Sequence, residues 1–238
     1  MNPKIPFRKL PSTDLSRIKA LKTAIKKASN IDFQDIAISM KTLSRAKRVM
    51  DKFERLCYKY QQTFDTQVKV NIALQSKVKN ARMYISHFIQ VLYMSVMRTE
   101  IKSEHLGLYG LEDLDFIVPD LTSNEQLLEW GQKIINGENK RVSQGGAPIY
   151  NPGIAKVNVM YVLFKESYQT QQIHQKATDR ILNEVSEVRS EVDNVIFDIW
   201  EEVENFNAKL PVNERLDKNR EYGLIYYYRK GEIVNEDN

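Results

Sequence analysis

The chain has 238 residues, of which 42% are hydrophobic and 28% are charged, and its net charge is +4. This length fits one large domain or two small ones, and the apolar content is too high for a disordered chain. A single cysteine, Cys57, excludes an internal disulfide framework and a cysteine-based zinc site. The sequence contains no apolar run of about 18 residues that would predict a membrane span. Its first residues lack the apolar segment of a secretory signal, so we expect a cytoplasmic protein.

Glycine and proline divide the chain into three zones. Between Pro11 and Gly107 lie 95 residues without either, and 57 more lie between Gly153 and Pro211, whereas residues 107–153 hold seven of the nine glycines. Because Gly and Pro interrupt helices, the two long zones can be helical and the middle zone cannot. We expect an all-α fold, an elongated antiparallel bundle of long helices with coiled-coil-like packing. The single domain would comprise a basic helical half (12–103), an irregular crossover (104–152), an acidic helical zone (153–210), and a short helix with a strand-like aromatic tail (211–238).

Apolar spacing supports helices in both long zones, and neither shows the alternation of a strand. The second zone contains an apolar repeat of about 3.5 residues, which is typical of a seam between nearly parallel helices. The residues of this repeat are Ile181, Val185, Val188, Val192, Val195 and Ile199. Whether 33–103 and 153–210 are single helices or hairpins stays open, because the residues from Thr63 to Thr66 could turn the chain.

Capping residues predict where two helices begin. Thr122 and Glu125 have the spacing of a capping box, which opens a helix over 123–135 that Gly137 ends. Asn151 followed by Pro152 is a cap and first-position pair, which opens the second long zone.

The two halves of the chain carry opposite charge. Residues 1–105 contain 21 Lys and Arg against 8 Asp and Glu, whereas residues 106–238 contain 14 against 23. Three explanations are open: basic helices packing on acidic ones within the chain, pairing between two copies, or an acidic partner such as nucleic acid or an anionic membrane surface. No helix-turn-helix, RNA-binding aromatic motif or zinc finger is present to read bases. A phosphate-binding patch would consist of Arg17, Lys19, Lys22, Lys26, Lys27, Arg45, Lys47 and Arg48.

No arrangement of residues predicts an enzyme. The three histidines, His87, His105 and His174, lack the Glu-x-x-His pairs of di-iron bundles and the spacing of zinc proteases. Cys57 lies among apolar neighbours with no base near it in sequence, which favours a packed thiol over a nucleophile. We therefore expect no catalytic residue, no cofactor and no metal.

A glycine-rich loop is the first candidate for binding. It matches neither a Walker A loop nor a dinucleotide fingerprint. The backbone amides of Gly145 and Gly146, the Arg141 side chain and the helix start at Asn151 could together hold an anion. The alternative is a surface connector whose glycines supply positive φ.

The aromatic tail is the second candidate for binding. This strand-like run could pair with residues 147–150, cover exposed core, or accept a partner strand at its edge. The tyrosines that would bind a partner are Tyr222, Tyr226, Tyr227 and Tyr228.

Several segments from about residue 80 onward resemble a known group of proteins. They are Ala81 to Leu92, Tyr109-Gly110-Leu111, Leu128 to Gly131, Gly145-Gly146-x-Pro148-x-x-Asn151-Pro152 and Arg220 to Tyr226. The segments resemble a group of uncharacterised all-helical bacterial proteins. The resemblance implies a helical fold and transfers no activity.

The sequence therefore predicts a non-enzymatic helical scaffold or protein–protein interaction protein that self-associates through helix faces. The expected partner is a protein, either a second copy or another chain. The alternative is a nucleic-acid-associated protein that binds phosphates through its basic N-terminal half.

Overall fold

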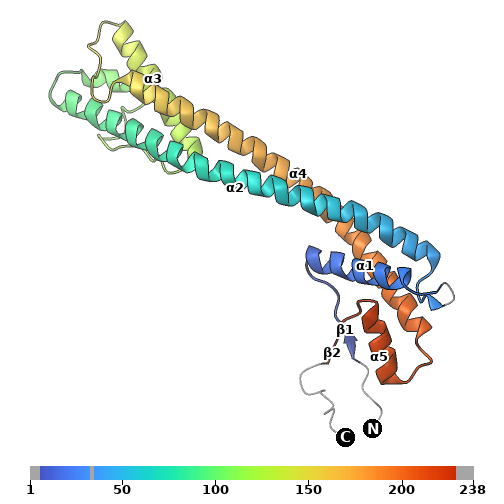
Figure 1. Ribbon diagram of the computed structural model, residues 1–238. Helices are drawn as coiled ribbons and strands as arrows, with labels where there is room; N and C mark the ends of the chain where they lie inside the picture. Colours follow the sequence, from blue (N-terminus) through green and yellow to red (C-terminus); the bar gives the residue numbers. More distant parts are fainter. Residues whose placement is uncertain (1–5, 33–34, 229–238) are drawn as a thin grey trace. The chain divides into compact units, whose positions relative to one another are not determined.

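The computed structural model describes residues 6–32 and 35–228 (Figure 1). Both long zones are single helices, so the predicted all-α class is confirmed and the question of hairpins is resolved. The elements in chain order are β1 (Phe7–Arg8), α1 (Asp14–Ser29), α2 (Met40–Met97), the 3-10 helix η2 (Ser103–Leu108), α3 (Asn124–Ser143), α4 (Ile154–Phe206), α5 (Val212–Glu221) and β2 (Tyr226–Tyr227).

The chain divides into two compact units. The first unit contains residues 1–62 and 179–238, and the second contains residues 63–178. Because α2 and α4 both cross these boundaries, each helix supplies one stretch to each unit. The start of α2 packs with the end of α4 in the first unit, and the end of α2 packs with the start of α4 in the second. The two long helices are therefore antiparallel within each unit.

The core of the first unit is formed by the apolar repeat of α4. All six residues of that repeat are buried, together with Trp200 and Val203 one turn further on. They pack against Phe53 on α2 and Leu21 on α1. The repeat read from the sequence thus marks the face that α4 buries.

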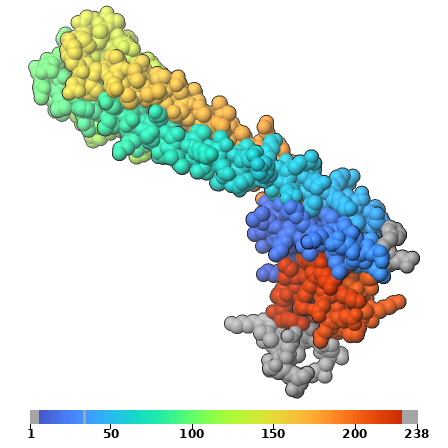
Figure 2. Space-filling view, viewed as in Figure 1, coloured from blue at the N-terminus to red at the C-terminus, as the bar shows by residue number. Residues whose placement is uncertain are grey.

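The two ends of the described chain meet in the first unit. β1 and β2 pair antiparallel, with Phe7 opposite Tyr227 and Arg8 opposite Tyr226. The predicted pairing of the tail with residues 147–150 is wrong, since Tyr150 forms a bridge with Gly153 instead. The tail and the loop belong to different units, so the tail finds its partner at the other end of the chain. Figure 2 shows α1 in blue against α5 in red, which is a packing contact between these helices.

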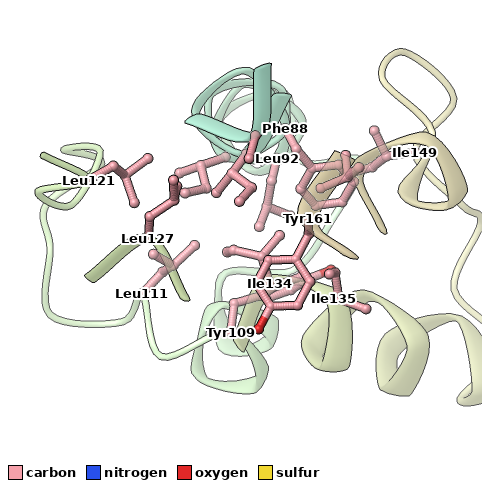
Figure 3. Packing of buried hydrophobic residues seen from close by; sticks show 14 of the residues in the cluster. Phe88, Leu92, Tyr109, Leu111, Leu121, Leu127, Ile134, Ile135, Ile149 and Tyr161 are labelled. Atoms are coloured by element: carbon pink, nitrogen blue, oxygen red, sulfur yellow. The ribbon is translucent and has the colours of Figure 1, made fainter. Parts of the chain in front are cut away.

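The core of the second unit is built from four segments. Phe88 and Leu92 on α2 face Ile134 on α3 and Tyr161 on α4 (Figure 3). Leu111 and Leu121, from the connection between η2 and α3, close one side. The segment expected to be an irregular crossover therefore carries its own share of the core.

Three predicted boundaries are wrong. The capping box that opens α3 uses Ser123 and Gln126, one residue later than predicted. The helix does not end at Gly137 but continues to Ser143. A Cβ atom on Gly137 would lie 2.5 Å from the Tyr109 ring and 2.8 Å from the Leu108 carbonyl oxygen, so this glycine serves packing rather than termination. The Asn151-Pro152 pair forms a turn with a cis peptide bond, and α4 begins only at Ile154.

Candidate functional site

The glycine-rich loop follows directly from the end of α3. Gly145 adopts a φ of +91°, a conformation that favours glycine and turns the chain away from the helix. Its amide donates to the Val142 carbonyl at 2.9 Å, and the Gly146 amide donates to the Arg141 carbonyl at 3.1 Å. Both amides therefore satisfy the end of α3 and are not offered to an anion, contrary to the role considered from the sequence.

A buried charged network lies behind this loop. Glu138 is 0% exposed and Arg141 is 2% exposed. The Arg141 Nη2 atom donates to Glu138 Oε1 at 2.9 Å and to the Ala147 carbonyl at 2.9 Å. The Tyr109 hydroxyl donates to Glu138 Oε2 at 2.5 Å and accepts from Arg141 Nε at 2.9 Å. Glu138 also accepts the amide of Ile149 at 3.0 Å, so the network ties α3 to η2 and to the loop.

The surroundings of this network hold the Tyr109 hydroxyl in its neutral form. Burial raises the pKa of Tyr109, and its hydrogen bond to the Glu138 carboxylate raises the pKa further. The proton on the hydroxyl keeps one hydrogen bond on the carboxylate, whose charge the Arg141 guanidinium balances. Glu138 had no signal in the sequence, because a helical Glu and Arg three residues apart usually form an exposed surface pair.

A cavity of about 630 Å³ lies in the second unit beside this loop. Arg141, Gly145 and Gly146 line it, as expected from the sequence, but Asn151 is not among its lining residues. Lys102 and His105 line it as well, and sequence reasoning missed both for this site because they lie in η2 or just before it. The fold, rather than any spacing in the chain, brings these groups to one cavity.

The cavity does not contain an assembled catalytic group. Ser95, Glu100 and His105 line it and are residue types found in nucleophile, acid and base roles. Within residues 6–32 and 35–228 no hydrogen bond joins any two of these side chains, so no nucleophile is activated by a base in the way that covalent catalysis needs. In the same residues no three His, Cys, Asp or Glu side chains gather as a metal site would require.

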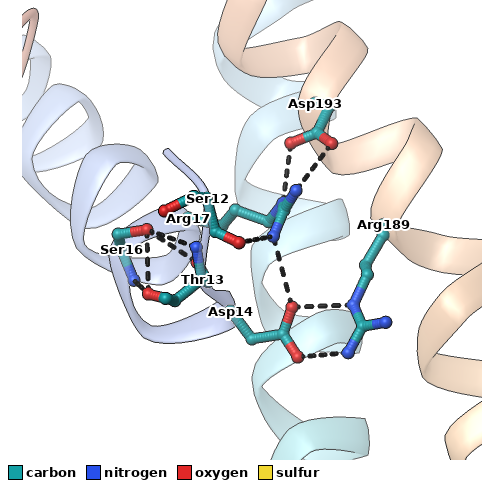
Figure 4. A network of polar contacts seen from close by, with 7 residues as sticks. All are labelled: Ser12, Thr13, Asp14, Ser16, Arg17, Arg189 and Asp193. Carbon is teal, nitrogen blue, oxygen red and sulfur yellow. Dashed lines mark hydrogen bonds and ion pairs between the residues drawn. The ribbon is translucent and has the colours of Figure 1, made fainter. Parts of the chain in front are cut away.

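Half of the predicted phosphate-binding patch is engaged in ion pairs. Arg17 forms a bidentate pair with Asp193, with an Nε to Oδ1 distance of 2.7 Å, and Arg189 forms another with Asp14 (Figure 4). These pairs join α1 to α4 in the first unit. Three more patch residues are also paired: Lys22 with Glu54, Lys27 with Glu221 and Arg45 with Asp198. The remaining four, Lys19, Lys26, Lys47 and Arg48, are exposed and have no ion-pair partner among the described residues.

The opposite charges of the two halves nearly cancel within each unit. By sequence, the first unit carries 23 Lys and Arg against 20 Asp and Glu, and the second carries 12 against 11. Each unit combines a basic stretch from the start of the chain with a stretch from its acidic half. Of the three explanations for the asymmetry, packing of basic helices on acidic ones within the chain has this direct support.

The tyrosines of the tail are partly used inside the first unit. Tyr222 is buried, and the Tyr226 hydroxyl donates to Glu204 at 2.8 Å and accepts from Asn219 at 2.9 Å. Tyr227 lies against Phe7 with 5.9 Å between ring centroids. Only Tyr227 and Tyr228 are among the exposed residues of the four predicted to bind a partner.

Cys57 is expected to react slowly with thiol reagents. Burial, with a smaller contribution from the charge of Asp14, raises the pKa of its thiol to about 11. Since the thiolate is the reacting form, its population near pH 8 should be lower than in the unfolded chain by about 100-fold. Labelling with an aromatic disulfide reagent, with and without denaturant, measures this ratio. Equal rates in the two conditions would show that the thiol is not held as described.

No helix within the described residues has an apolar stretch of the length and low charge that a bilayer crossing requires. No protein-family model, curated protein or solved structure matches this chain. The fold defines the class as an all-α protein with two antiparallel long helices, and function must be argued from geometry alone.

Proposed function

We propose that this protein is a non-enzymatic helical scaffold that self-associates through the second-unit face of α2. The observation that carries the proposal is a row of exposed apolar side chains on that helix. Ile72 is 69% exposed, Met83 is 52% exposed and Met94 is 44% exposed. Met97, one turn beyond Met94, is exposed as well.

These side chains share one side of the helix. Ile72, Met83 and Met94 are 11 residues apart, and 11 residues are close to three helical turns. The fully buried Ile85 and Leu92 lie on the opposite side, where α2 contacts the core. The row spans about 33 Å along the helix at about 1.5 Å per residue. We name the surface of Ile72, Met83 and Met94 the α2 apolar row.

The equal spacing of the α2 apolar row suits a second copy of the same chain. A two-fold contact requires that residue i meets residue j and that j meets i. If two antiparallel copies cross at Met83, each Met83 meets its counterpart and each Ile72 meets a Met94. The same symmetry places Ser76 opposite Gln90, a polar pair that can form a hydrogen bond. The row is therefore complementary to itself, which a different partner would not require.

The charges near the row give the association a definite salt dependence. Lys69 and Lys79 are exposed on the same side of α2, so two copies would bring like charges together. Salt screens such repulsion and strengthens apolar contact. We expect self-association to tighten as the salt concentration rises.

Replacing Met83 by glutamate is expected to weaken self-association at least tenfold. The two-fold contact would place two carboxylates opposite each other at its centre, where like charges repel. Sedimentation velocity over a concentration series, at low and high salt, measures the dissociation constant. The matched control is Val159→Glu, which makes the same kind of change at a side chain of similar exposure, 49%, on α4. Equal effects of the two substitutions would count against the α2 apolar row.

Disulfide trapping tests the geometry of the contact directly. In a Cys57→Ala background, Met83→Cys should form a covalent dimer on mild oxidation, because the two-fold axis passes between the paired side chains. Ile72→Cys alone should not, whereas Ile72→Cys combined with Met94→Cys should. A chain that remains monomeric at high concentration and yields no trapped dimer would overturn the proposal.

Nucleic-acid binding is the second candidate function, supported by the four exposed cations of the predicted patch. Phosphate binding weakens as salt rises, because bound counterions are released. The two candidates therefore predict opposite responses to salt. Reversing Lys26, Lys47 and Arg48 to glutamate should abolish duplex binding measured by fluorescence anisotropy, and unchanged binding would remove this candidate.

A further inference from the structure

The cavity in the second unit contains polar atoms that lack partners. The Nδ1 atom of His105 is buried and has no hydrogen-bond partner among the described residues. Buried polar atoms in proteins are nearly always hydrogen-bonded, so an atom without a partner points to a group that the chain itself does not supply. His105 lines the cavity, which makes the cavity the place for that group.

Arg141 has a free edge at the same cavity. Its Nε atom donates to Tyr109 and Glu138, and its Nη2 atom donates to Glu138 and Ala147. Its Nη1 atom donates to no described residue. A Cβ atom on Gly146 would lie 2.7 Å from Nη1, and Gly146 lines the cavity beside it. The absence of a side chain at residue 146 therefore leaves this edge of the guanidinium uncovered.

The charges of the lining favour a ligand that carries an anionic group. Lys102 is exposed, lines the cavity and has no ion-pair partner among the described residues. The charge of Arg141 is balanced by Glu138, so Lys102 supplies the unpaired positive charge. Glu100 is the carboxylate in the lining, and an anion would sit away from it.

The remaining surface of the cavity is apolar. Val91, Ile101, Pro148 and Ile149 all contribute to the lining. Binding sites for small molecules commonly combine such walls with a few polar groups that fix orientation, and their volumes of about 300 to 1,000 Å³ include this one. The ligand should therefore have an apolar body as well as a charged end.

We propose that this cavity binds a small amphipathic carboxylate. Its carboxylate accepts hydrogen bonds from Arg141 Nη1 and from an N–H at His105 Nδ1, and its charge pairs with Lys102. Its apolar body lies against Val91, Ile101 and Pro148. This site is independent of self-association, because the α2 apolar row contributes no residue to the lining.

Two carboxylates and their neutral counterparts test the site. The probes are 3-phenylpropanoate and hexanoate, each compared with its primary amide by titration calorimetry of the full chain. We expect saturable binding of at least one carboxylate, and binding at least tenfold weaker for its amide. No saturable binding of either carboxylate at millimolar concentration, or equal binding of acid and amide, would overturn the proposal.

The histidines supply a second measurement that reports location. The chain has three, and neither His87 nor His174 lines the cavity. The ¹⁵N resonances of the three rings can be assigned by single His→Gln replacements. The bound carboxylate should shift the Nδ1 resonance of His105 and leave those of His87 and His174 unchanged. Equal shifts at all three rings would show that the probe binds nonspecifically.

A matched pair of lysine variants tests the charge. Lys102→Gln should weaken carboxylate binding at least tenfold, whereas Lys69→Gln, the same change at an exposed residue of α2 outside the cavity, should leave it unchanged. Because both lysines are exposed, neither variant should disturb folding, and circular dichroism checks this. Equal affinity of the two variants would overturn the placement of the carboxylate.

Discussion

Glu138→Gln is expected to lower the free energy of unfolding of the second unit by about 3 to 5 kcal/mol, the usual cost of leaving a buried charge without its partner. The substitution keeps the size of the side chain but removes the negative charge that balances Arg141. It also places amide hydrogens where Tyr109, Arg141 and the Ile149 amide all donate to a carboxylate. Urea unfolding measures the loss, and hydrogen exchange read by mass spectrometry assigns it to one unit.

The control for this variant lies on the same helix. Glu129 forms an exposed ion pair with Lys133, and its side chain is 61% exposed. Such a pair contributes between about 0 and 1 kcal/mol, so Glu129→Gln should be nearly neutral. A double variant, Glu138→Gln with Arg141→Met, removes both charges and should be more stable than Glu138→Gln alone. Similar small losses for Glu138→Gln and Glu129→Gln would contradict the description of a buried charged network.

Gly137→Ala is expected to destabilise the second unit by about 1 to 3 kcal/mol, the range for overpacking a filled core. In an exposed helix the same change would stabilise by about 1 kcal/mol, because alanine is the better helix former. Here the new methyl group would collide with the Tyr109 ring and with the backbone of Leu108. The ring cannot move aside easily, because its hydroxyl is held by Glu138 and Arg141.

Gly107→Ala is the matched control for this prediction. Gly107 lies in η2, next to Leu108, but a Cβ atom there would meet nothing within 4 Å. We expect its unfolding midpoint in urea to differ little from that of the unchanged chain. If Gly137→Ala proved as stable as Gly107→Ala, the close approach of α3 to Tyr109 would be wrong.

The helices could be predicted from the sequence because their signals are local. The absence of Gly and Pro over 95 and 57 residues permits continuous helix, and the α4 repeat from Ile181 to Ile199 marks the buried face. Boundaries were less certain where one residue can serve two purposes. Gly137 looks like a helix end in the sequence, but its lack of a side chain is used for packing against Tyr109.

The candidate site could be predicted only in part. The glycine-rich loop and Arg141 were identified from the sequence, and both line the cavity. The sequence could not show that the two glycine amides are used at the end of α3. Nor could it show that Arg141 pairs with Glu138 in the interior, or that Lys102 and His105 line the cavity of the loop about 40 residues further on.

The sequence by itself determined the all-α class, the two long helices and the side of α4 that is buried, because helix formation and apolar periodicity depend on residues within a few turns. It also contained the opposite charges of the two halves. Only the tertiary structure decided what these charges do, since antiparallel packing brings basic and acidic stretches together and leaves each unit close to neutral. The partners of Glu138 and of the tail likewise depend on contacts between residues far apart in the chain, which no local pattern encodes.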